Sequence, residues 1–160
     1  MGRKIVVTSG KGGVGKTTLT ASLGIAIAET GKKVVLVDAD IGLNNLDVVL
    51  AVENKVVYDV LDVISGKCRL KQALIQDVDN PTLYVLPSAK IQDSPLITAC
   101  SFRNVVDALA LNFDFVIIDC PAGIDNGFHR SVSAATEAIV VTTPHISAVR
   151  DADKVLSILS

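Results

Sequence analysis

Tryptophan is absent from the 160-residue chain, and aromatic residues are scarce, with four phenylalanines and two tyrosines. Aliphatic side chains must therefore supply most of the core, as they do in buried parallel sheets. Hydrophobic residues make up 49% of the chain, which is enough for one globular domain with a substantial core.

Cysteine is also rare, since Cys68, Cys100 and Cys120 form no C-x-x-C pair and their number is odd. No basic segment with a following apolar run and a small-residue cleavage site precedes the first expected strand, so we expect no signal peptide. Long apolar runs are missing as well, because stretches such as residues 115–118 and 138–141 are far shorter than a membrane span. These absences favour a reducing, cytoplasmic location.

The chain also lacks a large excess of charge of one sign. Lys and Arg number 15 against 17 Asp and Glu, and the formal net charge is −2. Domains that bind nucleic acid commonly carry a basic surplus on one face. The composition therefore gives no reason to expect nucleic acid as a partner, although it leaves a local basic patch open.

What the sequence does contain is an alternation of β-branched runs with helix-like segments. The expected strands are residues 4–8, 34–37, 83–86, 115–118 and 138–142, and the expected helices are residues 17–30, 57–64, 101–112, 127–135 and 147 onward. Strands separated by helices predict an α/β fold with right-handed crossovers and a mostly parallel sheet covered by helices on both faces. The last apolar stripe reaches the final residue without a stop signal, so we expect residues 1–160 to form a single domain that is incomplete, or truncated, at the C-terminus.

The helix expected over residues 17–30 carries an apolar stripe of Leu19, Leu23, Ala26 and Ile27, which predicts that this face is buried. Gly24 lies inside the same helix, where it costs about 1 kcal/mol relative to Ala. We expect this glycine to let the helix lie close to the sheet.

A glycine-rich segment joins the first expected strand to this helix, and it reads Gly10-Lys11-Gly12-Gly13-Val14-Gly15-Lys16-Thr17. It matches the phosphate-loop pattern G-x-x-x-x-G-K-[ST] between a strand and a helix, which is the context that the pattern requires. Glycines let backbone amides approach phosphate oxygens, and the helix N-terminus adds partial positive charge. Lys16 would reach the β- and γ-phosphates and Thr17 would bind Mg²⁺. The alternative, a glycine-rich turn with an ordinary surface lysine, explains less of the pattern.

Carboxylates follow two of the expected strands. Asp119 ends the apolar run 115–118, where a carboxylate is typical of a Walker B residue that holds Mg²⁺. Asp38 and Asp40 follow the run 34–37, and residues two apart in an extended segment point the same way. One of them could serve the metal and the other the attacking water. Aspartates also favour turns, so turn formation remains an alternative for each.

The residues from Lys11 to Thr18 resemble the deviant Walker A motif of the MinD/ParA family of P-loop NTPases. The resemblance implies a homodimer formed with ATP, in which Lys11 reaches across to the nucleotide of the partner subunit. It makes Lys11, Lys16 and Asp40 catalytic, with Asp40 positioning water, and it assigns Thr17, Asp38 and Asp119 to Mg²⁺. The implied nucleotide-binding residues are Gly10, Lys11, Gly12, Gly13, Val14, Gly15, Lys16, Thr17, Thr18 and, in a segment like switch II, Gly123.

Further segments resemble the division-site branch of this family, and they include residues 42–47, 57–60, 72–75, 83–87, 119–124 and 147–153. This resemblance implies an ATPase that helps to place the septum while it cycles on the inner face of the membrane, in a plastid if the source is eukaryotic. It implies a MinC-like division inhibitor and a MinE-like or equivalent regulator as partners, and a C-terminal membrane helix that is not present in these 160 residues. Arg150, Asp151 and Asp153 are either part of a partner surface or solvated charges.

Two other functional hypotheses remain open from the sequence alone. A ParA-type DNA or plasmid partitioning ATPase would use the same switch. An iron–sulfur carrier of the same fold would need cysteines at a dimer axis. Cys100 and Cys120 lack the surrounding glycine-rich motifs of such proteins, and we expect buried or half-buried free thiols instead.

Overall fold

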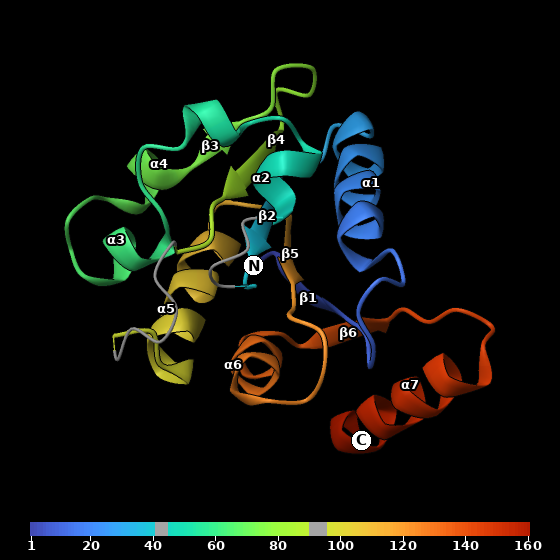
Figure 1. Cartoon of the computed structure of the whole chain (residues 1–160). Helices are drawn as coiled ribbons and strands as arrows, with labels where there is room; N and C mark the ends of the chain where they lie inside the picture. Colours follow the sequence, from blue (N-terminus) through green and yellow to red (C-terminus); the bar gives the residue numbers. More distant parts are fainter. Residues whose placement is uncertain (41–44, 90–95) are drawn as a thin grey trace.

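The computed structural model describes residues 1–40, 45–89 and 96–160. Within these ranges a six-stranded sheet has the order β3-β4-β2-β5-β1-β6 (Figure 1). The strands are β1 (Arg3–Thr8), β2 (Val34–Asp38), β3 (Ile75–Gln76), β4 (Leu83–Leu86), β5 (Phe115–Asp119) and β6 (Glu137–Val140). All neighbouring pairs are parallel except β3 with β4, which are antiparallel. The predicted α/β class with a mostly parallel sheet is therefore confirmed.

The strand register brings the two aspartates that end β2 and β5 to one edge of the sheet. Asp38 at the end of β2 pairs with Asp119 at the end of β5, and Val7 of β1 pairs with the same Asp119. Because the carboxyl ends of parallel strands meet at one edge, the loop after β1 lies beside both carboxylates.

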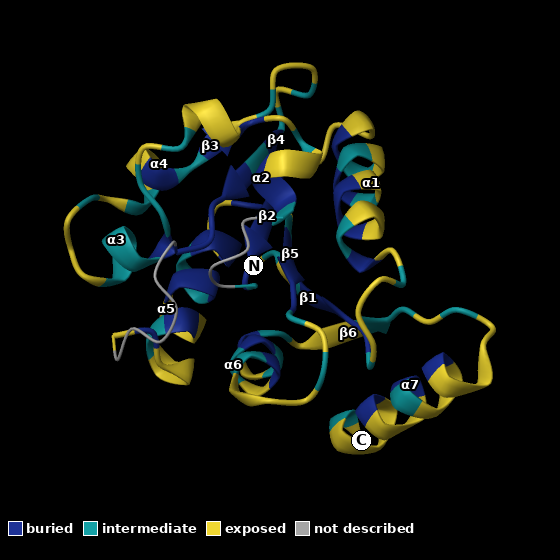
Figure 2. Ribbon diagram, viewed as in Figure 1, coloured by how far each residue is buried: buried dark blue, intermediate teal, exposed yellow. Residues whose placement is uncertain are grey.

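Helices cover both faces of this sheet, as Figure 1 shows for α1 on one side and α5 and α6 on the other. The helices are α1 (Lys16–Glu29), α2 (Asn45–Val49), α3 (Val60–Ile64), α4 (Leu70–Ala73), α5 (Ala99–Ala110), α6 (Asn126–Ala134) and α7 (Ile146–Leu159), with a short 3₁₀ turn, η1, at Glu53–Lys55. Phe102 of α5 and Phe128 of α6 pack on one face, while the small residues of α1 pack on the other. Figure 2 shows buried residues concentrated between these layers and α7 exposed along its outer side.

The buried face of α1 differs from the predicted stripe. Thr20, Ala21, Gly24 and Ala28 are buried, whereas Leu19 is 40% exposed and Ala26 is exposed. The prediction is wrong for Leu19 and Ala26, whereas Leu23 and Ile27 are half-buried and pack against the core. Small residues form the centre of the buried face because the helix lies close to β2. The role expected for Gly24 is confirmed, since a Cβ at this position would lie 2.7 Å from Cδ2 of Leu36.

The remaining boundaries agree with the predictions to within a few residues. The expected helix 57–64 begins later, at Val60, because the carboxylate of Asp59 accepts a hydrogen bond from the amide of Asp62 and caps the helix there. Four short elements were not predicted, namely α2, η1, α4 and β3. Within the described part of the chain, no helix has the length and apolar character needed to cross a bilayer.

Candidate functional site

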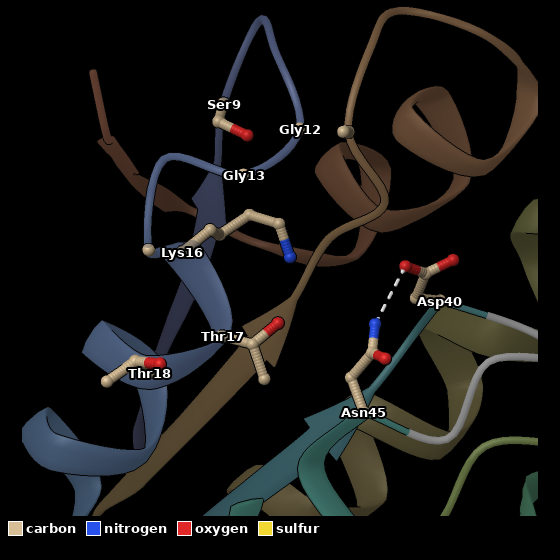
Figure 3. A pocket seen from close by; sticks show the side chains of 10 residues that line it. Ser9, Gly12, Gly13, Lys16, Thr17, Thr18, Asp40 and Asn45 are labelled. Carbon is tan, nitrogen blue, oxygen red and sulfur yellow. Dashed lines mark hydrogen bonds between the residues drawn. The ribbon is translucent and has the colours of Figure 1, made fainter. Parts of the chain in front are cut away.

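The glycine-rich segment forms the loop between β1 and α1. Gly15 stands immediately before the helix with a φ of 90°, in the left-handed region that favours glycine. The loop and its surroundings enclose a cavity of about 380 Å³. The described residues that line it are Ser9, Gly12, Gly13, Gly15, Lys16, Thr17, Thr18, Asp40, Asn45 and Ala122. Figure 3 shows Lys16 and Thr17 facing Asp40 and Asn45 across this space.

Asp119 lies beneath the loop and contacts two residues of the phosphate-loop pattern, Lys16 and Thr17. One carboxylate oxygen pairs with the ammonium of Lys16, and the other accepts a hydrogen bond of 2.9 Å from the hydroxyl of Thr17. Lys16 is only 8% exposed and Asp119 is fully buried, so each compensates the charge of the other away from water. The predicted phosphate lysine, metal hydroxyl and Walker B carboxylate therefore form one connected group.

Asp38 is fully buried beside Asp119. Its two carboxylate oxygens accept hydrogen bonds from the amides of Asp40, at 3.1 Å, and Leu46, at 3.2 Å. Burial, followed by the charge of Asp119, raises the pKa of Asp38 to about 7, against the lowering effect of the two amides. A cation bound at this carboxylate would favour its ionised form.

Asp40 is half-buried and lines the cavity, and its predicted action on water remains a prediction. Burial raises its pKa, and the nearby charge of Lys16 opposes that rise. The amide of Asn45 donates a hydrogen bond of 3.3 Å to the Asp40 carboxylate (Figure 3). Asn45 was not predicted as a site residue, and the only signal was its place in the polar segment that follows Asp40. Gly42 to Asn44 of that segment lie outside the described residues.

Two predicted residues, Gly123 and Lys11, make their contacts outside the cavity. The amide of Gly123, after β5, donates a hydrogen bond of 3.2 Å to the carbonyl of Ser9. The ammonium of Lys11 hydrogen-bonds the Ser147 hydroxyl of α7 at 3.4 Å, and the backbone of Gly10 lies against that of Asp151 on the same helix. Gly10, Lys11, Val14 and Gly123 are not among the residues that line the cavity. Their contacts with nucleotide remain predictions.

The ligand types at the site suit a hard divalent cation. Carboxylates of Asp38 and Asp119 and the hydroxyl of Thr17 are oxygen donors of the kind that Mg²⁺ prefers. No grouping of three or more His, Cys, Asp and Glu that could hold a metal occurs in the part of the chain that is described. The hydroxyl of Thr17 and phosphate oxygens would therefore have to complete the coordination.

The three thiols are free and differ in environment. Cys68 is half-buried, Cys120 is buried and Cys100 is exposed, so the expectation of buried or half-buried thiols is wrong for Cys100. Burial raises the pKa of Cys120 to about 11. A free, protonated thiol at this position contacts the hydroxyls of Thr8 and Ser131 and behaves as part of the core.

Comparison with known proteins provides a further line of evidence. A family model described as an AAA domain matches residues 2–160. The chain is 54% identical to the septum site-determining protein MinD of Bacillus subtilis over 160 residues, which are 99% of this chain and 60% of that protein. It is also 54% identical to a putative MinD of Guillardia theta over 99% of this chain and 59% of the relative. The chain thus spans about 60% of the length of these curated relatives.

This chain is also similar to solved structures of MinD proteins. The MinC:MinD cell division complex of Aquifex aeolicus superposes with a TM-score of 0.88 at 45% identity, over 98% of this chain and 63% of that one. MinD of Pyrococcus horikoshii complexed with Mg-ADP gives a TM-score of 0.88 at 38% identity, over 99% and 65%. The cell division ATPase MinD of Pyrococcus furiosus gives 0.88 at 37% identity, over 99% and 67%.

Proposed function

Because the chain belongs to the MinD family of septum site-determining proteins, we propose that it binds ATP with Mg²⁺ and hydrolyses it as a switch in division-site placement. The observation that carries the proposal is the group formed by Lys16, Thr17 and Asp119 beneath a glycine-lined cavity, with Asp40 on the opposite wall. The Mg-ADP complex of the Pyrococcus horikoshii relative supports the choice of ligand.

Each residue then has a distinct task. Backbone amides of the loop and the ammonium of Lys16 bind phosphate oxygens, so Lys16 exchanges Asp119 for the nucleotide. Thr17, Asp38 and Asp119 would hold Mg²⁺, which would supply positive charge to neutralise the phosphates. Asp40, oriented by Asn45, positions the water whose attack breaks the bond between the γ-phosphorus and ADP. This chemistry depends on positioning and charge more than on covalent help from the protein.

The second part of the proposal concerns Lys11 and dimerisation. It lies outside the cavity of its own subunit and ends on Ser147, so it is available to reach another active site. We assign it to the nucleotide of the partner subunit in an ATP-dependent homodimer. Dimerisation would then couple turnover to assembly on the inner face of the membrane. The MinC:MinD complex of the Aquifex relative supports a MinC-like inhibitor as partner, and a MinE-like regulator completes the proposed cycle.

Two substitutions test binding and turnover separately. Lys16→Ala should weaken binding of a fluorescent ATP analogue roughly 100-fold, because charge-assisted hydrogen bonds to two phosphates are lost. Asp40→Ala should retain binding but lower turnover by roughly 100-fold, as expected for loss of a positioned polar group. Lys32→Ala, at an exposed position outside the cavity, is the matched control. Unchanged affinity in Lys16→Ala, or normal phosphate release in Asp40→Ala, would contradict the assignment.

Lys11→Ala tests the switch. The variant should still bind nucleotide but should remain monomeric when ATP is added, because the proposed contact between subunits is missing. Multi-angle light scattering with ATP and with ADP measures this directly. An ATP-dependent dimer of normal strength would remove Lys11 from the interface while leaving the nucleotide site intact.

A further inference from the structure

A second cavity lies at the opposite end of the sheet from the phosphate loop. Its volume is about 710 Å³, within the range of roughly 300 to 1,000 Å³ that is common for sites of small ligands. Lys33, which precedes β2, and Phe113, which precedes β5, form part of its wall, together with Lys71 and Leu74. Since β2 and β5 end at the carboxylates of the nucleotide site, the two cavities are separated by the length of these strands. The proposed ATPase function does not use this one.

One wall of this cavity holds a cation in a fixed place. The ammonium of Lys33 lies 4.8 Å from the ring centre of Phe113 and 5.7 Å from that of Tyr84. The two rings meet edge to face, with centres 5.4 Å apart. The backbone of Lys33 is anchored as well, because its amide donates to the Asp114 carboxylate at 2.8 Å and its carbonyl accepts from the Asp114 amide at 2.8 Å. Cation–π contacts of this kind position an ammonium without neutralising it.

The lining combines positive charge with apolar surface. The described lining residues include Lys33 and Lys71 but no Asp or Glu, and no ion pair is found for either ammonium among the described residues. Leu74 and Leu111 add aliphatic surface, and 70% of Leu111 is exposed. Gln76 adds a polar group whose amide donates to the carbonyl of Pro81 at 2.8 Å, which leaves its side-chain oxygen free to accept a hydrogen bond.

We propose that this cavity binds a small organic anion with an aromatic or branched apolar body. Its carboxylate pairs with the ammonium groups of Lys33 and Lys71, and its apolar part packs on Leu74 and Leu111. The charge complementarity selects an anion, because two lysines without a carboxylate in the lining repel a cation. The edge-to-face ring pair and the leucines select an apolar body over a simple inorganic ion.

The experiment uses 2-naphthoate as the probe and 2-naphthamide as its uncharged match. Amide chemical shifts of the ¹⁵N-labelled protein, recorded during titration of each compound, locate and quantify binding. We expect naphthoate to shift residues around Lys33, Lys71 and Phe113, and naphthamide to bind roughly tenfold more weakly, because it lacks the charge-assisted hydrogen bonds. Lys33→Met and Lys71→Met, which keep the length of the side chain, should each weaken naphthoate binding by a similar factor. Lys32→Met, at the neighbouring exposed position, should leave it unchanged.

Four results would overturn the proposal. Naphthoate could bind the Lys33→Met and Lys71→Met variants as tightly as the parent protein, with both variants giving native spectra. Naphthamide could bind as tightly as naphthoate. The shifts could centre on the exposed apolar residues of α7, or an acidic peptide with leucine side chains could shift the Lys33 cavity when naphthoate does not. The last result would assign the cavity to a protein partner.

Discussion

Asp38→Asn is the substitution whose effect depends most clearly on the geometry of the site. Asp38 is fully buried next to Asp119, and burial and this neighbouring charge raise its pKa from the ordinary 3.8 to about 7. Without a bound cation, ionised Asp38 therefore destabilises the fold at neutral pH. Asparagine has nearly the same shape and carries no charge, so it removes this cost.

The magnitude follows from the pKa. Each tenfold change in an acid constant corresponds to about 1.4 kcal/mol, so a rise from 3.8 to about 7 costs the ionised folded form on the order of 4 kcal/mol. Because the folded state binds the proton more tightly, stability is highest below the unfolded pKa and falls as the pH rises from about 4 to about 7. The substitution also has a cost, since an amide nitrogen cannot accept from the backbone of Asp40 or Leu46, and losing one such bond costs about 1–2 kcal/mol.

The two effects predict a difference that changes with pH. Asp38→Asn should be more stable than the parent by about 2–3 kcal/mol at about pH 8, and this advantage should vanish or reverse near pH 4.5. Urea unfolding followed by circular dichroism, in EDTA and without nucleotide, measures the difference at each pH. Asp153→Asn, at an exposed position of α7, controls for the change in net charge. A difference between Asp38→Asn and the parent that is constant across this pH range would refute the reasoning.

Two further predictions concern packing and reactivity. Gly24→Val should lower the free energy of unfolding by about 1–3 kcal/mol, because its side chain would meet Leu36 where even a Cβ would lie at 2.7 Å; an unchanged urea midpoint would mean that α1 does not pack so closely on β2. Cys100 should react with a thiol reagent in the native protein while Cys120 reacts only on unfolding, since Cys100 is exposed and burial raises the pKa of Cys120 to about 11. Equal rates for the two thiols under native conditions would contradict their placement.

The sequence was sufficient for five of the six strands and for the phosphate loop because both signals are local. A β-branched run such as Val34–Asp38, or a loop with glycines at fixed spacing, carries its information within a few residues. The buried face of α1 could not be predicted in the same way. Its composition depends on how closely the helix approaches Leu36, which is set by the whole sheet. This contact places Ala21, Gly24 and Ala28 at the centre of the buried face and leaves Leu19 of the expected stripe exposed.

Contacts between the site residues could not be predicted from the sequence either. Asp38 and Asp119 were predicted as single residues from the ends of their strands, but their adjacency comes from strand pairing across 81 positions of sequence. The contact of Asn45 with Asp40 depends on the position of α2, a helix of five residues that is too short to show a helical period. Pairing of Lys16 with Asp119 requires the loop and β5 to fold against each other first.

The pairing of Lys16 with Asp119 affects how a nucleotide would leave the site. Lys16 and Asp119 are both buried, and a departing nucleotide would leave two unbalanced charges in a region that water reaches poorly. Because the two groups meet each other, departure instead leaves a neutral pair with its hydrogen bonds made. Under the proposed function, re-forming this pair would offset part of the free energy that holds the phosphates, which would moderate affinity and ease exchange. Such an arrangement would suit the repeated cycling that we propose.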